Sequence, residues 1–499
     1  MSIEPMKVLV ANRGEIAVRI LRSCRELGFP SVAVFSEADR EALHTRIADE
    51  SIYIGPAPAS ESYLNINTII EAAKISGANA VHPGYGFLSE NTEFAQAVEQ
   101  AGMIFIGPRP DTIAATGDKL IARKLAREAG LPVLPGPDFP ITEEIPPELM
   151  NQVKYPVLVK AVAGGGGRGI RLANSPQELE DMVRAASAEA MAAFGDDAVY
   201  LEPLVQNARH IEVQILGDGE GNVLCLGERE CSIQRRRQKL IEECPAPSLT
   251  DPQRKKIYDY ALRLSRHLHY RSLGTIEFLL DSEGNLYFIE CNPRIQVEHP
   301  VTEMVVGVDL VSAQLILAAT GILPYTPDQI RMHGAAIEVR VLAEDPDMGF
   351  IPVAGEISYL KEPGGPGIRV DSALYQGMPV TTNYDSLIAK VIAWGEDRDR
   401  AIRRLRRALM EFQIGGVPTD IDFLLQILAS EKFIHARADT TYLDTFTIAP
   451  MDGQELFEKE LALAAVLLAE QEKYNVTQGL DQTPMSYWRM TAWREQLRG

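Results

Sequence analysis

Several features of other protein classes are missing from this sequence. No apolar run reaches the roughly 18 residues that a membrane-spanning helix needs, and no basic segment followed by an apolar stretch opens the chain. There are five cysteines, none of them in a CxxC pair: Cys24, Cys225, Cys231, Cys244 and Cys291. Their odd number argues against a disulfide framework, and their spacing argues against a zinc site. We therefore expect a cytoplasmic protein with reduced thiols, no signal peptide and no membrane partner.

Basic residues are also scarce relative to acidic ones. The chain has 49 lysines and arginines against 69 aspartates and glutamates, which gives a formal net charge of −20. A nucleic-acid surface needs clustered Lys and Arg, so we expect no nucleic-acid partner. In so acidic a chain, local basic clusters are correspondingly informative, and one that stands out is QRRRQK at 234–239.

Two familiar nucleotide-binding motifs are absent. No GxGxxG follows the first predicted strand, which argues against a dinucleotide site, and no GKS or GKT accompanies the glycine-rich segment, which excludes a P-loop. There is also no internal repeat and no low-complexity tract. What the chain does have is 499 residues of ordinary globular composition, enough for about two to four domains.

The first part of the chain alternates predicted strands with helix-length segments. A helix at about 16–27 follows the first strand, and the strands are expected at 7–12, 31–35, 51–55, 80–84 and 103–107. Strands joined by such crossovers predict a doubly wound parallel sheet. We expect an N-terminal Rossmann-like domain over residues 1–115.

From residue 116 the pattern changes. An amphipathic helix over 118–130 precedes runs that are typical of an antiparallel sheet: HIEVQILGD, NVLCLGERE, TIEFLLD and NLYFIEC. We expect one domain over 116–332, with a lid at about 133–204, and a mixed α+β domain over 333–446. The remaining segment, 447–499, is expected to be a helical extension.

The segment TIEFLLDSEGNLYFIECN predicts a hairpin with a short turn. If Asp281 pairs with Leu286, Glu277 falls directly opposite Glu290, and two facing acids in apolar sequence are costly. A divalent cation resolves this conflict, and Asn292 on the same face adds a third hard oxygen suited to Mg²⁺. A solvated sheet face that tolerates both acids is the alternative.

Polar side chains continue beyond this hairpin at every second position. They are Glu290, Asn292, Arg294, Gln296 and Glu298. Because successive side chains of a strand point to opposite faces, these five would line one face. The chain therefore places acids, amides and a guanidinium in one row directly after a buried strand.

Four consecutive glycines lie in AVAGGGGRG at 161–169. Their backbone can approach a ligand closely and can move. Because the run follows Lys160 and separates two short predicted strands, it predicts a hairpin lid whose N–H groups cover phosphate. A plain linker is the alternative.

Four other residues are open to both a functional and an ordinary interpretation. Lys119 opens a helix, where most lysines are simply solvated, and a lone His210 at a strand start is more often structural. Lys239 belongs to a basic cluster that fits an exposed run, but it directly precedes the apolar-acidic LIEE. Tyr85 lies in HPGYGFLSEN, which is either a turn or a ligand-binding strand end of an open sheet.

Together these motifs resemble the biotin carboxylase family. They occur in that family's order over roughly residues 7–446: NRGEIAVRI, HPGYGFLSEN, GDK, VKAVAGGGGRGIR, RHIEVQ, ERECSIQRRRQK, GTIEF, FIECNPRIQVEHPVTE and IEVRVLAEDP. The resemblance implies an ATP-grasp fold, α/β and α+β, with an N-terminal doubly wound domain, a mobile glycine-rich lid and a C-terminal α+β domain. It also implies ATP- and bicarbonate-dependent carboxylation of biotin carried on another protein.

The resemblance assigns roles to particular residues. Mg²⁺ or Mn²⁺, with two ions expected, would be held by Glu277, Glu290 and Asn292. ATP would be contacted by Lys119, Lys160, Gly166, Gly167, Glu202, Pro203, Leu204, Val205, His210, Gln234, Arg237, Glu277 and Glu290. Bicarbonate would be bound by Lys239, Arg294, Gln296, Val297 and Glu298. Biotin would meet Tyr85 and Arg340, and catalysis would fall to Arg294, Glu298, Arg340 and Lys239.

In this scheme Glu298 takes the proton of bicarbonate, which then attacks the γ-phosphate to give carboxyphosphate. Carboxyphosphate breaks down to CO₂ and phosphate in a closed site that excludes water. The phosphate can deprotonate biotin N1′, while Arg340 stabilises the enolate-like oxygen. Arg237 and Pro203 stand where better-known bacterial members have His and Lys, which affects nucleotide contacts rather than the reaction.

Two other functions fit part of the pattern. Another ATP-grasp ligase, making a carbamoyl or aminoimidazole carboxylate product, would keep the fold and the metal site, although RIQVEHPVTE, HPGYGF and Arg340 favour biotin. A non-catalytic nucleotide-binding subunit would be indicated by the loss of Lys239, Arg294 or Glu298, and all three are present.

Other chains are implied as partners. The only Met-Lys, Met6-Lys7, opens the first strand, so biotin is expected on a separate biotin carboxyl carrier protein, with a carboxyltransferase as the other partner. The family suggests a homodimer, with Arg19 and Arg22 in the interface region, and acetyl-CoA carboxylase of fatty acid biosynthesis as the whole complex. The final acceptor, acetyl-CoA, propionyl-CoA or pyruvate, is not encoded here. The helix of the extension either docks a partner or packs on its own domain.

Overall fold

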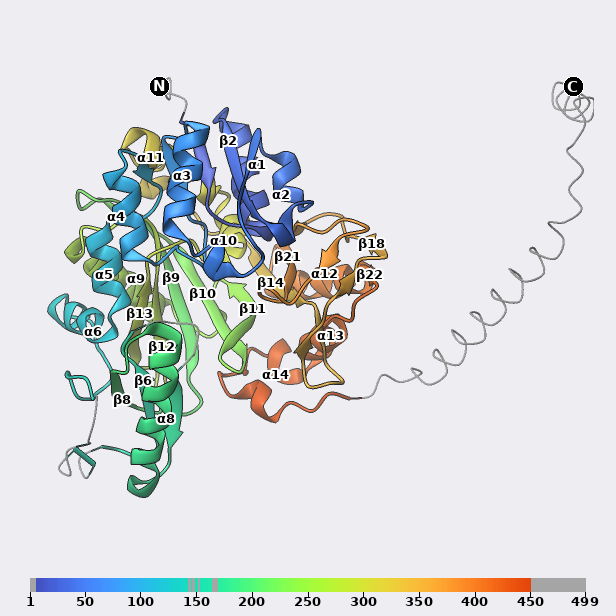
Figure 1. Ribbon diagram of the computed structural model, residues 1–499. Coiled ribbons are helices and arrows are strands. Elements are labelled where there is room, and N and C mark those ends of the chain that lie inside the picture. Colours follow the sequence, from blue (N-terminus) through green and yellow to red (C-terminus); the bar gives the residue numbers. More distant parts are fainter. Residues whose placement is uncertain (1–5, 142–144, 146–148, 151–152, 164–168, 450–499) are drawn as a thin grey trace, which may run out of the picture. The chain divides into compact units, whose positions relative to one another are not determined.

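The structure is a computed structural model (Figure 1), and it describes residues 6–141, 145, 149–150, 153–163 and 169–449. Residues 1–446 form one compact unit and 447–499 a second. The helix expected in the extension, and the lid residues Gly166 and Gly167, lie outside the described residues.

The N-terminal part is a doubly wound α/β layer, as the sequence predicted. Its five strands are all parallel, in the order β3-β2-β1-β4-β5. Helices cover the sheet, so strands such as β1 and β2 are apolar on both faces. The elements are β1 Val8–Val10, α1 Gly14–Leu27, β2 Ser31–Ser36, α2 Leu43–Ile47, β3 Glu50–Gly55, α3 Ile66–Ser76, β4 Ala80–His82, α4 Thr92–Gln100, β5 Ile104–Phe105 and α5 Pro110–Gly117.

The expected lid contains a small antiparallel sheet in the order β7-β6-β8. The pairing of β6 with β7 confirms the hairpin predicted around the glycine run. Helix α8 packs on this sheet (green in Figure 1), and the two share a separate apolar cluster that includes Val157, Val159, Leu179 and Val183. The elements are β6 Val157–Ala161, β7 Ile170–Ala173, α8 Pro176–Phe194 and β8 Val199–Pro203.

One eight-stranded antiparallel sheet organises the rest, in the order β13-β12-β9-β10-β11-β14-β21-β19. Because β11 pairs with β14, the sheet continues across the boundary expected at residue 332. The division into domains on either side of that residue stays a prediction. The elements are α6 Lys119–Glu128, β9 Arg209–Asp218, β10 Val223–Arg235, β11 Gln238–Cys244, α9 Asp251–His267, β12 Arg271–Leu280, β13 Leu286–Asn292, α10 His299–Val306, α11 Leu310–Thr320, β14 Ala335–Leu342, β19 Ile368–Ser372 and β21 Leu387–Gly395.

Two apolar cores cover different parts of this sheet. Helices α6 and α9 bury Ala126 and Ile257 against Val213 and Phe278. Further along, the core includes Val391 of β21 and a small helical layer, with short strands at its margin. These elements are β15 Glu344–Asp345, β16 Ile351–Pro352, β17 Gly355–Glu356, β18 Tyr359–Lys361, β20 Pro379–Val380, α12 Arg398–Glu411, β22 Gln413–Gly415, α13 Ile421–Ala429 and α14 Glu431–Ile434.

All five cysteines are free, as expected, and four of them are buried. Among the described residues no single helix has the length and apolar character needed to cross a bilayer. One pair of helices, α10 and α11, passes that test only when taken together, and it is bent by 90°.

Candidate active site

The two acids of the hairpin face each other, but by a different route from the one predicted. Leu280 pairs with Leu286, so the predicted pairing of Asp281 with Leu286 was wrong by one residue. A β-bulge at Ile289 then shifts the register and brings Glu290 opposite Glu277. The bulge turns Glu290 to the polar face of the hairpin, while Phe288 stays in the apolar core.

The polar row is not carried by a single strand. Strand β13 ends at Asn292, and the following residues form an irregular loop before α10, so the prediction of a five-residue strand face was wrong beyond that point. The side chains nevertheless stay in contact. Arg294 donates to Gln296 Oε1 at 2.8 Å, and Asn292 Nδ2 donates to Glu277 Oε1 at 2.8 Å.

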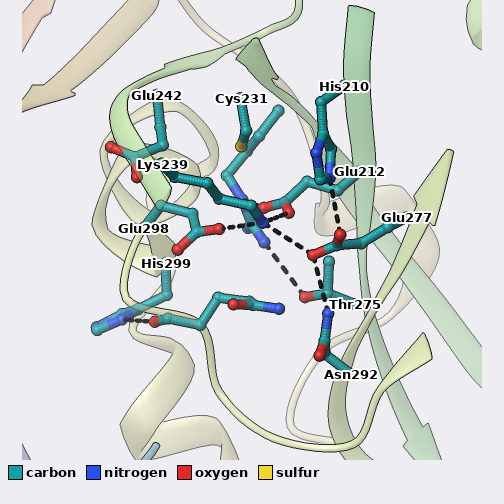
Figure 2. Close-up of polar contacts among 12 residues, drawn as sticks. His210, Glu212, Cys231, Lys239, Glu242, Thr275, Glu277, Asn292, Glu298 and His299 are labelled. Carbon is teal, nitrogen blue, oxygen red and sulfur yellow. Dashed lines mark hydrogen bonds and ion pairs between the residues drawn. The ribbon is translucent and has the colours of Figure 1, made fainter. Parts of the chain in front are cut away.

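At the centre of the site, three acids converge on Lys239 (Figure 2). Its Nζ lies 2.5 Å from Glu212 Oε2, 2.8 Å from Glu277 Oε1 and 2.8 Å from Glu298 Oε1. Burial alone would lower the pKa of Lys239, but the three acids raise it well above its usual value. The site thus holds a permanent cation, positioned from β11, among carboxylates from β9, β12 and the loop before α10.

Glu298 is kept ionised by its neighbours. It is fully buried, which raises the pKa of a carboxyl group, but Lys239, Arg340 and Arg229 outweigh burial and hold its pKa well below the usual range. The second oxygen of Glu298 accepts from Arg340 Nη2 at 3.0 Å. Glu298 is therefore a carboxylate at neutral pH, able to accept a proton from a bound group.

Arg340 lies between two acids. Its guanidinium contacts Glu242 Oε1 at 2.6 Å as well as Glu298. Burial raises the pKa of Glu242 to about 7, although Arg340 opposes that shift. Sequence reasoning missed Glu242, and it missed Glu212 and Arg229 as well. A signal that could have found them is a charged residue within a predicted strand, although the charged neighbours Glu228, Glu230 and Glu243 weaken it.

The hairpin acids fit a divalent cation. Burial, and then the like charge of Glu277, raise the pKa of Glu290, which is the conflict that a cation would relieve. Asn292 lies within reach of both acids, since its Nδ2 is 2.8 Å from Glu277 and 3.4 Å from Glu290. Exchange of its amide oxygen and nitrogen would offer a third oxygen ligand. Two carboxylates and an amide form the oxygen-rich donor set that Mg²⁺ prefers.

The residues expected at the nucleotide fall in two groups. His210 Nε2 lies 2.7 Å from Glu277 Oε2, and Gln234 Nε2 lies 2.9 Å from His210 Nδ1. These two residues therefore lie beside the hairpin acid Glu277. Lys160 is instead paired with the buried carboxylate of Glu202, which also binds Arg123.

The segment expected beside adenine is Glu202, Pro203, Leu204 and Val205. The Leu204 N–H is already bonded to the Pro156 carbonyl at 3.0 Å. Lys119 donates to the Ala161 carbonyl at 3.2 Å, beside the lid sheet. Burial lowers the pKa of Lys119.

Tyr85 and Arg237 form hydrogen bonds outside the cluster around Lys239. The Tyr85 hydroxyl donates to Glu15, a buried acid of α1. Arg237 is exposed on the β10–β11 turn and donates to the carbonyl of Ile170 in the lid sheet at 3.0 Å. Of the two arginines expected near a dimer interface, Arg19 pairs within the chain, with Glu303 at 3.0 Å and Asp309 at 2.8 Å, and Arg22 is exposed.

The arrangement suits anion chemistry beside a metal. A cation and an ionised carboxylate, Lys239 and Glu298, can hold and deprotonate a small anion. Lys239 also contacts Glu277, one of the two hairpin acids that could hold a metal. A cationic group that can stabilise a developing oxyanion, Arg340, touches the same carboxylate.

Three family models match consecutive parts of the chain. They are the biotin carboxylase N-terminal domain over residues 4–113, the carbamoyl-phosphate synthase L chain ATP binding domain over 118–326, and the biotin carboxylase C-terminal domain over 338–445. Biotin carboxylase 1 of Bacillus subtilis is 47% identical over 444 residues, covering 89% of this chain and 99% of that protein.

Solved structures resemble the chain over most of its length. A Campylobacter jejuni biotin carboxylase in a β,γ-ATP complex superposes with a TM-score of 0.87 at 44% identity, covering 89% of this chain and all of the other (100%). The biotin carboxylase domain dimer of Hydrogenobacter thermophilus 2-oxoglutarate carboxylase, in complex with MgADP, ADP and bicarbonate, gives a TM-score of 0.85 at 45% identity, covering 89% and 99%.

Proposed function

The chain belongs to the biotin carboxylase family of ATP-grasp ligases, and from this premise we propose that it carboxylates carrier-bound biotin with ATP and bicarbonate, by way of carboxyphosphate. The observation that supports this most directly is the contact of Lys239 with both Glu298 and Glu277. It joins an anion-binding cation, a base and the edge of a metal site in one cluster.

The metal is proposed to be Mg²⁺, or Mn²⁺, with two ions in the complete complex. Glu277, Glu290 and Asn292 would hold it, because they are the hard oxygen donors of the hairpin. When bound, it would neutralise charge on the phosphates of ATP.

ATP is proposed to lie between the hairpin and the lid sheet. The contacts would come from His210 on β9, Gln234 at the end of β10, Arg237 on the β10–β11 turn, Lys119 on α6 and Lys160 on β6. The segment 202–205 would run beside adenine, and Gly166 and Gly167 would close over the phosphates. The departures at Pro203 and Arg237 would alter affinity, since proline offers only its carbonyl and arginine brings a charge.

Bicarbonate is proposed to bind between Lys239 and Arg294, beside Gln296 and Val297. Glu298 would take its proton, since the surrounding cations keep that carboxylate ionised. The oxygen so activated attacks the γ-phosphorus, and the bond to ADP breaks to give carboxyphosphate. Closure over the site would exclude water from this product.

Biotin is proposed to enter between Tyr85 and Arg340. Phosphate released from carboxyphosphate takes the N1′ proton, and Arg340 stabilises the negative ureido oxygen while N1′ attacks CO₂. Biotin would arrive on a biotin carboxyl carrier protein, and a carboxyltransferase would use the carboxybiotin. We propose acetyl-CoA as the final acceptor, a homodimeric enzyme, and the domain division at residues 115, 332 and 446.

The test is ATP hydrolysis by the purified chain. We expect it to require bicarbonate and to rise when free biotin is added, and Glu298→Gln is expected to lower the bicarbonate-dependent rate at least about 100-fold. Hydrolysis indifferent to bicarbonate and biotin would instead support another ATP-grasp ligase. Full turnover by the variant would contradict the role of Glu298. Carboxyl transfer to acetyl-CoA, propionyl-CoA, pyruvate and 2-oxoglutarate, measured with the co-purifying transferase, identifies the acceptor.

A further inference from the structure

Lys390 is a fully buried lysine that the proposed reaction does not use. It lies on β21, directly opposite Arg340 of β14 on one side and Asp371 of β19 on the other. Its side chain has 0% exposure, yet the residues around it on β21 are apolar. A charged group in such a position is costly unless something specific requires it.

The contacts of Lys390 reach both sides of the active site. Its Nζ donates to the Val297 carbonyl at 2.8 Å, in the loop that carries the base. It also lies 3.1 Å from Glu15 Oε1, and Glu15 in turn accepts the hydroxyl of Tyr85. One buried ion pair therefore connects the loop expected at bicarbonate with the tyrosine expected at biotin.

The contact with Val297 fixes a particular peptide. The loop after β13 has no ladder of its own, so a buried carbonyl there needs a donor from elsewhere. The peptide that carries the Val297 oxygen also carries the N–H of Glu298, and peptides are planar. Holding that oxygen therefore sets the orientation from which the Glu298 side chain leaves the backbone.

The contact between Lys390 and Glu15 fixes the acceptor of the Tyr85 hydroxyl. One oxygen of Glu15 bonds with Lys390, and its other oxygen is buried without a hydrogen-bond partner among the described residues. Burial raises the pKa of Glu15, and Lys390 is the main influence that opposes this shift. Without the lysine, Glu15 would lose the charge that makes it a strong acceptor for the tyrosine hydroxyl.

We propose that Lys390 and Glu15 form a positioning pair that fixes the Glu298 loop and Tyr85 relative to each other. The pair would thereby fix the positions of bound bicarbonate and biotin relative to each other. This inference rests on the proposed function. The pair acts through Val297 and Tyr85 and touches neither substrate.

Lys390→Met tests the pair, because methionine fills a similar volume without charge or donor. We expect kcat/KM for bicarbonate to fall between about tenfold and about 100-fold, while KM for ATP changes less than about twofold. Glu15→Gln keeps an acceptor for Tyr85 but removes the charge, and it is expected to raise KM for biotin with the same sparing of ATP. The double variant should lose less than the product of the two single losses.

Arg398→Met is the matched control. Arg398 forms a partly buried ion pair with Glu243, at 2.5 Å, that touches no proposed substrate residue, so its loss reports the general effect of breaking an ion pair within the fold. If Lys390→Met matches Arg398→Met in its bicarbonate and biotin parameters, the proposal is wrong.

If Lys390→Met does not fold, Glu15→Gln decides. Unchanged KM for biotin in Glu15→Gln overturns the proposal, and a selective rise supports it. If the wild-type chain shows no bicarbonate-dependent ATP hydrolysis, the proposed function itself is wrong. If the wild type is active and the variants keep its kinetic parameters, only the positioning pair is wrong.

Discussion

A single buried acid, Glu242, contacts Arg340, the cation proposed to stabilise the biotin oxyanion. Glu242 Oε1 lies 2.6 Å from Arg340 Nη2, the same nitrogen that lies 3.0 Å from Glu298 Oε2. Since burial raises the pKa of Glu242 to about 7, this acid gains a proton as the pH falls below that value and stops being an anionic partner. Arg340 is then held by Glu298 and the weaker, neutral contact alone.

We predict that Glu242→Gln slows biotin carboxylation about tenfold or more at pH 8, the effect of losing one charge-assisted hydrogen bond. Wild-type kcat/KM for biotin should fall below about pH 7, whereas the variant should show little of this acid limb, because glutamine resembles the protonated acid. The measurement is a pH profile of both proteins from pH 6 to 9.

Glu243→Gln is the control for this profile. Glu243 is the next residue on β11, is also buried, and pairs with Arg398 instead of Arg340. An acid limb that survives unchanged in Glu242→Gln, or disappears equally in Glu243→Gln, would show that Glu242 does not set it.

Individual residues were predictable to different degrees. The facing acids were found because two glutamates in apolar strands form an evident conflict. Local pattern set Lys239 apart from its exposed neighbours only by the LIEE that follows it, and only the fold shows that its ammonium reaches Glu212 on β9. Glu212 and Lys390 were missed because the partners of each lie on other strands or helices, which no local pattern shows.

At the scale of an element, helix α6 depends on its first turn. Asp118 caps it, accepting from the N–H groups of Leu120 at 2.8 Å and Ile121 at 3.0 Å. Lys119, the first residue of the helix, lies beside the lid sheet. The cap therefore supports both the helix and the position of a lysine proposed to bind ATP.

We predict that Asp118→Ala lowers the free energy of unfolding by about 1 kcal/mol, the usual value of an N-cap. It should also raise KM for ATP while leaving KM for biotin unchanged. Urea unfolding and steady-state kinetics measure the two effects. Asp118→Ser, which can still cap, should retain both properties, and an equal defect in the serine variant would contradict the capping explanation.

The hairpin β12–β13 has two features that the alternation of residues in the sequence did not predict. Alternation predicted the strands, their antiparallel pairing and the meeting of Glu277 with Glu290. It could not predict the bulge at Ile289, because the strand register near the turn is set by packing of Phe278 and Phe288 in the core. Nor could it show that β13 stops at Asn292, where the chain turns away toward α10.

For the whole molecule, the sequence predicted the doubly wound N-terminal layer well, because parallel strands and helices alternate along the chain. The eight-stranded sheet was only partly predictable. Its strands were recognised, but the pairing of β11 with β14 joins segments about 100 residues apart, as in Ile241 opposite Val339. Such contacts between distant segments leave no local pattern in the sequence.

Buried histidines should make the folded chain sensitive to acid. His44 and His82 are fully enclosed, and burial lowers the pKa of His44 to about 4 and that of His82 to about 3. Both are neutral in the folded state, whereas the unfolded chain takes up protons near pH 6.5. Stability is therefore complete above about pH 6.5 and is lost as the pH falls from there, by about 1.4 kcal/mol per pH unit for each histidine.

We predict that His44→Gln reduces the dependence of the free energy of unfolding on pH below about 6.5. Its free energy of unfolding should fall less between pH 6.5 and 5 than that of the wild type, whatever the starting stability. Urea unfolding at several pH values gives both slopes. His435→Gln, which alters an exposed histidine, should keep the wild-type slope, and a parallel decline in His44→Gln would contradict the assignment.

The separate apolar cluster beneath the lid sheet has a practical consequence. Because Val157, Leu179 and their neighbours pack mainly among themselves, this segment has an apolar core of its own and could be exchanged between relatives as a unit. A chimera that receives the corresponding piece of a relative would exchange the ATP contacts proposed for Lys160 and the segment 202–205, while those proposed for Lys119, His210 and Gln234 would remain those of the host. Its bicarbonate and biotin handling, built on the larger sheet, would remain that of the host.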